Sequence, residues 1–321
     1  MVPTITETEV DRALDGVAEF FAERETRPGA VARRLLGHPL PDDERLIDHL
    51  IRERRRKTRL DGGIGGWVVG TTWSAWELMQ LGCPPDHTGV SRMIGYLLAR
   101  QDLPGRFGEG CSERRHAIGH CKHFLNGFFS PATADEVVSP LTFPSGVIIT
   151  HEWEARFAAS CFALRTVLQA RQERRKSVQL HLNGLVDLAA RWEQQQFSAS
   201  PDLLFFVLGA FALTPIEHRE HAQRLTNRLV AMQTEQGEWE SGSLFHALDN
   251  LLHAPFSEAR DAVQRATPPL IARQQPNGSF DETDNEELAL IALRALRTHG
   301  PARLKMRSPR VATSTIPRFR Y

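Results

Sequence analysis

Gln233-Thr-Glu-Gln-Gly237-Glu-Trp239 and Gln274-Gln-Pro-Asn-Gly278-Ser-Phe280 share one pattern with the earlier segment Gln101-Asp-Leu-Pro-Gly105-Arg-Phe107. Each begins with glutamine, has glycine four residues later, and ends with an aromatic residue two positions after the glycine. The first and second glutamines lie 132 residues apart, and the second and third lie 41 residues apart. The longer interval therefore corresponds to about three repeats of the shorter one. A recurrence of this length predicts an architecture of repeated supersecondary units.

Degenerate copies of this turn are expected where the period requires them. The segment Phe143 to Gly146 keeps a turn glycine, and Arg191 to Phe197 keeps a glutamine run that ends in an aromatic residue. The glycine-rich segment Asp61 to Trp67 stands one period before the first full copy. Together these segments indicate about six units.

Two kinds of helix are expected in each unit. Apolar runs with helical periodicity follow the turns: Thr71–Leu81, Glu152–Leu168, Pro201–Leu213, Ser241–Leu252 and Thr283–Leu296. More amphipathic runs lead into the next turn: Thr88–Arg100, Arg219–Gln233 and Glu258–Gln274. A helix pair cannot bury its apolar face alone, so the pairs should stack with the apolar helices inside and the amphipathic helices outside.

The fold class predicted from these runs is all-α. About six helical hairpins without distinct capping repeats favour a closed α/α toroid (an α6/α6-type barrel) around a central cavity, with an open solenoid as the alternative. Residues 1–60 are expected to form a helical segment that packs on the toroid of residues 61–299, and residues 300–321 a basic tail. A short β-hairpin around Pro144-Ser-Gly146, within residues 141–150, should interrupt the helices and form part of a lid or rim.

Composition limits the functional classes. The 321 residues include 39 basic and 39 acidic side chains, a balance that gives no reason to expect nucleic acid as a partner. The first 21 residues are acidic where a secretory signal would be basic, and no later run is apolar enough to span a membrane, so a cytoplasmic protein is expected. Four cysteines are too few for a disulfide scaffold in a chain of this length.

The repeated turns resemble the QW motifs of the terpenoid cyclase and prenyltransferase superfamily, which includes squalene-hopene cyclase. The likeness extends over about residues 60 to 297 and rests on the three full turns and on the helix that begins Thr71-Thr-Trp-Ser-Ala-Trp-Glu-Leu. It implies an α/α toroid whose inner helices begin at a cavity. The resemblance does not extend to the zinc ligands of protein prenyltransferases, an Asp-x-Cys pair with a distant histidine, nor to the Cys-His-Gly zinc signature of LanC-type toroids.

In the class II cyclases of that superfamily, the middle aspartate of an Asp-x-Asp-Asp element protonates the substrate. The resemblance places Glu282-Thr-Asp284-Asn285 at this position, so it implies that Asp284 is the proton donor, with Glu282 beside it. Glu replaces the first aspartate and Asn the last, and Glu286 and Glu287 follow. The same acidic residues are also typical of an ordinary helix N-terminus, where they interact favourably with the helix dipole.

A second candidate site is the segment from residue 111 to 123. If it is helical, its histidines fall on one stripe, and with the cysteines they would supply zinc or iron ligands and leave one coordination position open. The candidate ligands are Cys111, His116, His120, Cys121 and His123. Glu154, at the start of the next apolar helix, is a candidate base. Alternatively, Arg115 and its basic neighbours form a face for an anionic substrate, or the segment has no function.

Aromatic side chains on the apolar helices are the candidate substrate-binding residues, because aromatic faces stabilise cations. They are Trp73, Trp76, Trp153, Phe205, Phe206 and Phe245. The functional hypothesis is a terpene cyclase-like enzyme that acts on an isoprenoid or similar apolar molecule by protonation-initiated cyclisation. Magnesium would accompany a diphosphate substrate. A metal-dependent enzyme using the Cys and His segment and a non-catalytic binding scaffold are the alternatives, and a homodimer stays open.

Overall fold

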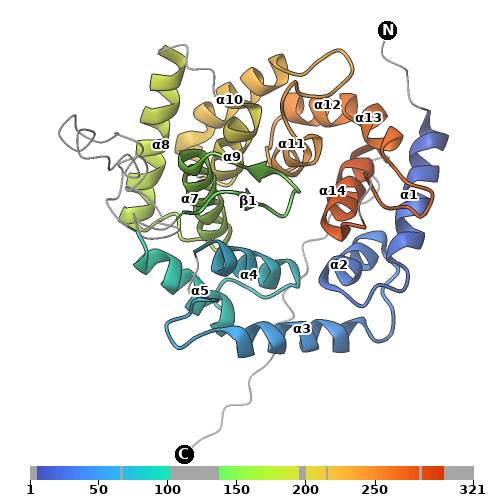
Figure 1. Ribbon diagram of the computed structural model, residues 1–321, viewed down its shortest axis with the longest axis horizontal. Helices are drawn as coiled ribbons and strands as arrows, with labels where there is room; N and C mark the ends of the chain where they lie inside the picture. The colour runs from blue at the N-terminus through green and yellow to red at the C-terminus, as the bar shows by residue number, and fades with distance from the viewer. Residues whose placement is uncertain are drawn as a thin grey trace, which may run out of the picture.

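The computed structural model describes residues 6–65, 68–101, 137–194, 200–214, 216–281 and 284–299. Helices are arranged as a ring, in which inner and outer helices alternate along the chain (Figure 1). The inner helices are α2 (Arg27–Leu36), α4 (Val68–Gln80), α7 (Glu152–Gln169), α9 (Pro201–Phe211), α11 (Leu244–Leu251) and α14 (Glu286–Leu296). The all-α prediction is therefore confirmed.

The outer helices precede or connect the inner helices along the chain. They are α1 (Glu7–Phe21), α3 (Asp43–Lys57), α5 (Thr88–Ala99), α8 (Lys176–Gln194), α10 (Arg219–Ala231), α12 (Ser257–Arg265) and α13 (Thr267–Ala272). Short 3-10 turns, η2 (Ile216–His218) and η3 (Arg297–His299), complete the helical segments. The run expected from Glu258 to Gln274 divides in two, because the helix ends at Arg265 and restarts before Pro268, whose ring cannot lie in a helix interior. No helix in the described ranges is long and apolar enough to cross a membrane.

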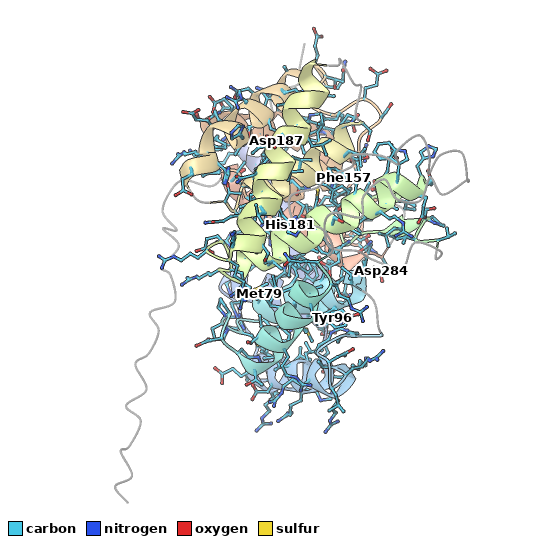
Figure 2. The ribbon with its side chains drawn as sticks, turned by 90° about the vertical axis from the view of Figure 1, so that its left-hand side faces the viewer. Met79, Tyr96, Phe157, His181, Asp187 and Asp284 are labelled. Carbon is cyan, nitrogen blue, oxygen red and sulfur yellow. The ribbon has the colours of Figure 1, made fainter. Side chains whose placement is uncertain are left out.

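The outer helix α8 illustrates how sequence periodicity sets burial. Val178, His181, Leu182 and Leu185 recur at helical spacing, and all four are fully buried. Asp187, on the opposite side of the same helix, is exposed. The view onto the edge of the ring shows α8 in front, with His181 and Asp187 on it (Figure 2). The amphipathic outer helices thus cover the apolar inner ones, as their sequences predict.

Three turns between an outer and an inner helix use the same backbone geometry. Gly62, Gly237 and Gly278 have φ values of 91°, 88° and 83°, which side chains other than that of glycine rarely adopt. A Cβ atom on each would lie 2.0 to 2.2 Å from a backbone carbonyl oxygen of a neighbouring outer helix. Glycine is therefore required at these turns both for the backbone angle and for close packing.

The last of these turns also joins the end of the chain to its beginning. A Cβ on Gly278 would meet the carbonyl oxygen of Gly16 in α1, and the Gln274 side chain donates a hydrogen bond to the Ala13 carbonyl at 2.9 Å. In the matching turn, the Gln233 side chain donates a hydrogen bond to the Ala262 carbonyl of α12, also at 2.9 Å. The outer helix α1, from the segment expected to pack on the toroid, therefore contacts the last turn in the way that α12 contacts the turn at Gln233.

The first turn is shifted relative to the expected register. Gln233 pairs with Trp239 and Gln274 with Phe280 in isolated antiparallel bridges, and the equivalent bridge in the first turn joins Thr58 to Ile64. Ile64 rather than Trp67 thus corresponds to the aromatic residue. The turn from Asp61 to Trp67 was aligned with the others by its aromatic residue. In the structure, the position equivalent to Trp239 and Phe280 holds the branched aliphatic side chain of Ile64.

A two-stranded hairpin lies at the centre of the ring (Figure 1), which confirms the predicted hairpin. β1 (Leu141–Thr142) pairs with β2 (Ile148–Ile149), and Gly146 has a φ of 78° in the turn between them. The interpretation of Phe143 to Gly146 as a degenerate outer turn is wrong, because these residues form the hairpin tip inside the ring. Glu152, at the start of α7, fixes the hairpin by accepting hydrogen bonds from the amides of Val138 and Ser139, both 2.8 Å long.

Candidate functional site

A small cavity lies between the hairpin tip and the inner helices α4, α7, α9 and α11. Its volume is about 10 Å³, about the room that one water molecule needs. The residues that line it combine aromatic rings with a few polar groups: Trp76, Phe143, Pro144, Ser145, Phe162, Arg165, Phe206, His246 and Asp249. Apolar walls with few polar groups are typical of small-molecule sites.

Aromatic rings form the wall next to the hairpin. The Phe143 ring at the hairpin tip lies 4.5 Å from the Phe206 ring of α9 and 5.8 Å from the Phe162 ring of α7, centroid to centroid. The Phe206 ring in turn lies 4.2 Å from the His246 imidazole of α11. Phe143 therefore fills space at the centre of the ring that the inner helices alone would leave empty.

A hydrogen bond between Ser145 and His246 holds the hairpin tip to α11. The Ser145 Oγ lies 2.9 Å from His246 Nδ1, and both side chains are buried. His246 Nε2 lies 3.2 Å from the backbone carbonyl oxygen of Asp202, which can only accept, so Nε2 carries the proton and Nδ1 accepts from the serine hydroxyl. Burial lowers the pKa of His246 to about 4, which favours this neutral imidazole.

A buried ion pair forms the polar wall of the cavity. Arg165 Nη1 in α7 donates to Asp249 Oδ2 in α11 at 2.7 Å, and to the Asn250 side-chain oxygen at 3.2 Å. Burial raises the pKa of Asp249, but attraction and hydrogen bonding by Arg165 outweigh it and hold the pKa well below its usual range. The Asp249 carboxylate is thus a fixed negative charge and not a proton donor.

Asp202 is a carboxylic acid whose pKa is raised. Burial at the start of α9 raises it, and a hydrogen bond of 3.0 Å from the Ser243 amide opposes the effect in part. Asp202 lies four residues before Phe206, so both fall on the same face of α9. The chain therefore holds an acid with raised proton affinity one helical turn from the aromatic wall.

Asp284 lies outside the closed interior, in front of α14. Its side chain is 58% exposed, and it accepts hydrogen bonds of 2.9 and 3.0 Å from Arg24. Glu286 and Glu287 bind Arg24 and Arg27, respectively, and join α14 to the start of α2. A proton donor must be kept from bulk water, which the exposure of Asp284 does not provide. Its role as the acid stays a prediction.

The other predicted residues divide between the cavity and the surrounding core. Trp76 and Phe206 line the cavity. Phe205 instead packs against Trp239, and Phe245 against Phe280, with ring centroids 5.3 and 6.1 Å apart. Successive helical residues are rotated by about 100°, so neighbours such as Phe205 and Phe206 face different surroundings.

Trp73, Trp153 and Glu154 are half-buried, and none of them lines the cavity described above. Glu282, Arg115 and all five candidate metal ligands lie outside the described residues: Cys111, His116, His120, Cys121 and His123. Within the residues that the structure does describe, no group of three or more His, Cys, Asp or Glu side chains is placed to hold a metal ion.

Sequence reasoning did not identify Ser145, Arg165, His246, Asp249 or Asp202 as site residues. A charged residue inside an apolar helical run was the available signal for Arg165, since such residues are rarely buried without a partner. Its partner lies 84 residues away in α11, and no local pattern links the two.

Acid is expected to destabilise the protein through its buried histidines. Burial lowers the pKa values of His246 and His253 to about 4 and that of His181 to about 3. A histidine in the unfolded chain has a pKa near 6.5, so the unfolded chain takes up protons below that pH while the folded protein does not. The free energy of unfolding is therefore highest above pH 6.5 and decreases as the pH falls toward 4. Each histidine contributes a slope of about 1.4 kcal/mol per pH unit within this range.

Urea unfolding between pH 7 and pH 5 measures this effect. His253→Gln should reduce the pH dependence, whereas His38→Gln, at an exposed position, should leave it unchanged. A free energy of unfolding that stays constant over this range would show that the three imidazoles are not buried as neutral groups.

The fold is similar to that of a terpene cyclase. An arginine-to-alanine variant of the type II terpene cyclase MstE from Scytonema, solved with its substrate geranylgeranyl dihydroxybenzoate, superposes with a TM-score of 0.51. It is 12% identical, and the match covers 91% of this chain and 98% of that one. An aspartate-to-asparagine variant with the same compound gives 13% identity, 91% and 97% coverage, and a TM-score of 0.49. No protein-family model and no curated protein sequence matches the chain.

Proposed function

We propose that the chain is a terpene cyclase-like enzyme and that its ring is the α/α toroid of that superfamily. Its substrate is an isoprenoid or similar apolar molecule, bound at the aromatic cavity. The observation that carries the proposal is the enclosure of one space by Trp76, Phe143, Phe162 and Phe206. Aromatic faces in a desolvated site attract positive charge, as a carbocation reaction requires.

Asp202 is the proton donor in this proposal. A carboxylic acid can protonate an alkene only if it carries a proton, and burial raises the pKa of Asp202 in the direction that this role needs. Its position, one helical turn before Phe206, would deliver the proton at the edge of the aromatic wall. Asp284, with Glu282 beside it, is the rival donor, and the two assignments differ in which substitution stops the reaction.

The hairpin has to move for a ligand of this class to bind. The cavity volume of about 10 Å³ lies far below the roughly 300 Å³ at which small-molecule sites begin. Phe143 occupies the centre of the aromatic wall, and packing and the Ser145 to His246 hydrogen bond hold the hairpin tip there. Displacing the tip would exchange the Phe143 ring for an apolar ligand group and keep the aromatic surfaces covered.

The proposal is tested by product formation from geranylgeranyl diphosphate and from a geranylgeranylated dihydroxybenzoate. Asp202→Asn retains the acceptor for the Ser243 amide but removes the acidic proton, so turnover should fall by roughly 100-fold or more. Asp284→Asn is the matched control and should turn over within a few-fold of wild type. The melting temperatures of both variants verify that they are folded.

Loss of turnover in Asp284→Asn and not in Asp202→Asn would transfer the acid role to Asp284. The absence of any product or saturable binding of the two isoprenoids by wild type would contradict the proposed function. The metal-dependent alternative makes a separate prediction: about one equivalent of zinc or iron in the purified protein, lost in His120→Ala.

A further inference from the structure

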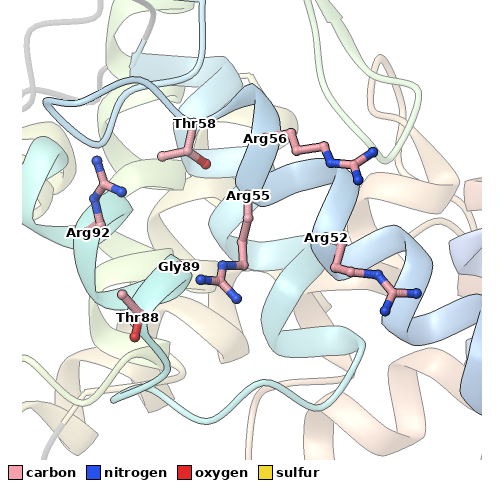
Figure 3. Close-up of a pocket in the computed structure, with 7 residues that line it drawn as sticks. All are labelled: Arg52, Arg55, Arg56, Thr58, Thr88, Gly89 and Arg92. Carbon is pink, nitrogen blue, oxygen red and sulfur yellow. The ribbon is translucent and has the colours of Figure 1, made fainter.

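A second pocket lies on the outside of the ring, between the outer helices α3 and α5 (Figure 3). Its volume is about 300 Å³. The lining residues are Arg52, Arg55, Arg56, Thr58, Thr88, Gly89 and Arg92. Four of the seven are arginines and none is acidic, so the pocket has a strong positive charge that the candidate interior site neither uses nor contacts.

Neighbouring acidic residues do not neutralise this charge. Arg54 on the same helix pairs with Glu77 at 2.7 Å, and Lys57 pairs with Glu53 at 2.6 Å. Glu77 and Glu53, the acids of these two pairs, are therefore already engaged. Within the described residues, Arg52, Arg55 and Arg56 make no ion pair, although three adjacent guanidinium groups repel one another. A bound anion would relieve that repulsion.

The opposite wall of the pocket is also suited to an anion. Thr88 and Gly89 form the first turn of α5, where the helix dipole favours negative charge, although the Gly89 amide already donates to His87 Nδ1 at 3.2 Å. Figure 3 shows the Arg55 guanidinium pointing toward these two residues. Arg92 Nη2 donates to the carbonyl oxygens of Arg59 and Leu60 at 2.8 and 2.9 Å, which holds its guanidinium in place at the rim.

We propose that this pocket binds a small anion with two or more phosphate groups. Arginine recognises phosphate with paired N–H donors, and four guanidiniums exceed what a single phosphate can engage. A volume of about 300 Å³ accommodates a diphosphate or a small phosphorylated molecule, but not an extended polymer. The pocket opens on the outer wall, so its ligand is distinct from a substrate in the ring interior.

Titration calorimetry with inorganic diphosphate and triphosphate tests the proposal, using the full chain at low ionic strength. Wild type should bind both saturably, more tightly than it binds sulfate, and more weakly as salt is added. Arg52→Gln and Arg55→Gln together should weaken binding at least tenfold. Arg45→Gln is the matched control on the same helix, because its side chain is 88% exposed and lies outside the pocket, and it should bind as wild type.

Two results would overturn the proposal. One is the absence of the expected binding behaviour: wild type binds neither anion saturably, or the double variant Arg52→Gln, Arg55→Gln keeps the wild-type affinity. The other is binding only to vesicles that contain anionic phospholipid and not to the soluble anions, which would make the arginines a membrane-contact surface. All three arginines used in the test are exposed, so unchanged melting temperatures should separate loss of binding from loss of folding.

Discussion

Asp249→Ala is expected to lower the free energy of unfolding by about 3 to 5 kcal/mol. The substitution leaves Arg165 buried without its carboxylate, while its side chain remains 5% exposed and cannot reach water. Arg294 also lies close enough to be stabilised by the Asp249 charge, which adds to the loss. Urea unfolding at pH 7 measures the change directly.

Two controls separate the buried charge from the loss of a side chain. Asp42→Ala removes an ion pair with Arg45 whose partners are 82% and 88% exposed, and it should cost at most about 1 kcal/mol. The double variant Arg165→Met, Asp249→Leu removes both charges and should recover most of the stability lost in Asp249→Ala. A cost below about 1 kcal/mol for Asp249→Ala would mean that water reaches the pair.

Gly278→Ala is expected to destabilise the protein by about 3 kcal/mol or more through the contact that joins the last turn to α1. A left-handed backbone conformation costs an alanine about 1 to 2 kcal/mol, and the φ of Gly278 is 83°. The added Cβ would also lie 2.0 Å from the Gly16 carbonyl oxygen, so α1 would have to move away from the turn. Overpacking of this kind costs about 1 to 3 kcal/mol.

Gly37→Ala provides a matched control for the backbone term. Gly37 has a φ of 80°, but a Cβ there would meet nothing within 4 Å. Its cost should therefore be about 1 to 2 kcal/mol, and the difference between the two variants measures the steric contact with α1. Equal costs would contradict the packing of α1 against the last turn.

Much of the fold follows from residues that are close together in sequence. The apolar run expected from Glu152 to Leu168 matches α7, which ends at Gln169, and the run expected from Pro201 to Leu213 matches α9, which ends at Phe211. Both agreements have a local cause, since helical periodicity and N-terminal residues act within a few positions of the chain. The hairpin turn at Gly146 was predicted for the same reason.

The candidate site was predicted less completely. Trp76 and Phe206 were among the expected aromatics, but nothing in the sequence distinguished Phe206, at the cavity, from Phe205, which packs against Trp239. The rotation of α9 about its own axis decides which of the two rings faces the cavity, and that rotation depends on packing against other helices. Asp284 was chosen for its sequence context, yet its pairing with Arg24 depends on the position of the N-terminal helices.

The sequence by itself determined the repeated turns and the helices between them. Glycine at positions 237 and 278 permits a backbone angle that few other residues adopt, and the apolar periodicity fixes which face of each helix is buried. Only the tertiary structure decided that the hairpin enters the ring, that α1 meets the last turn, and that Arg165 faces Asp249. These contacts join segments from 84 to more than 260 residues apart, so their energies depend on how whole helices are placed and not on local conformation.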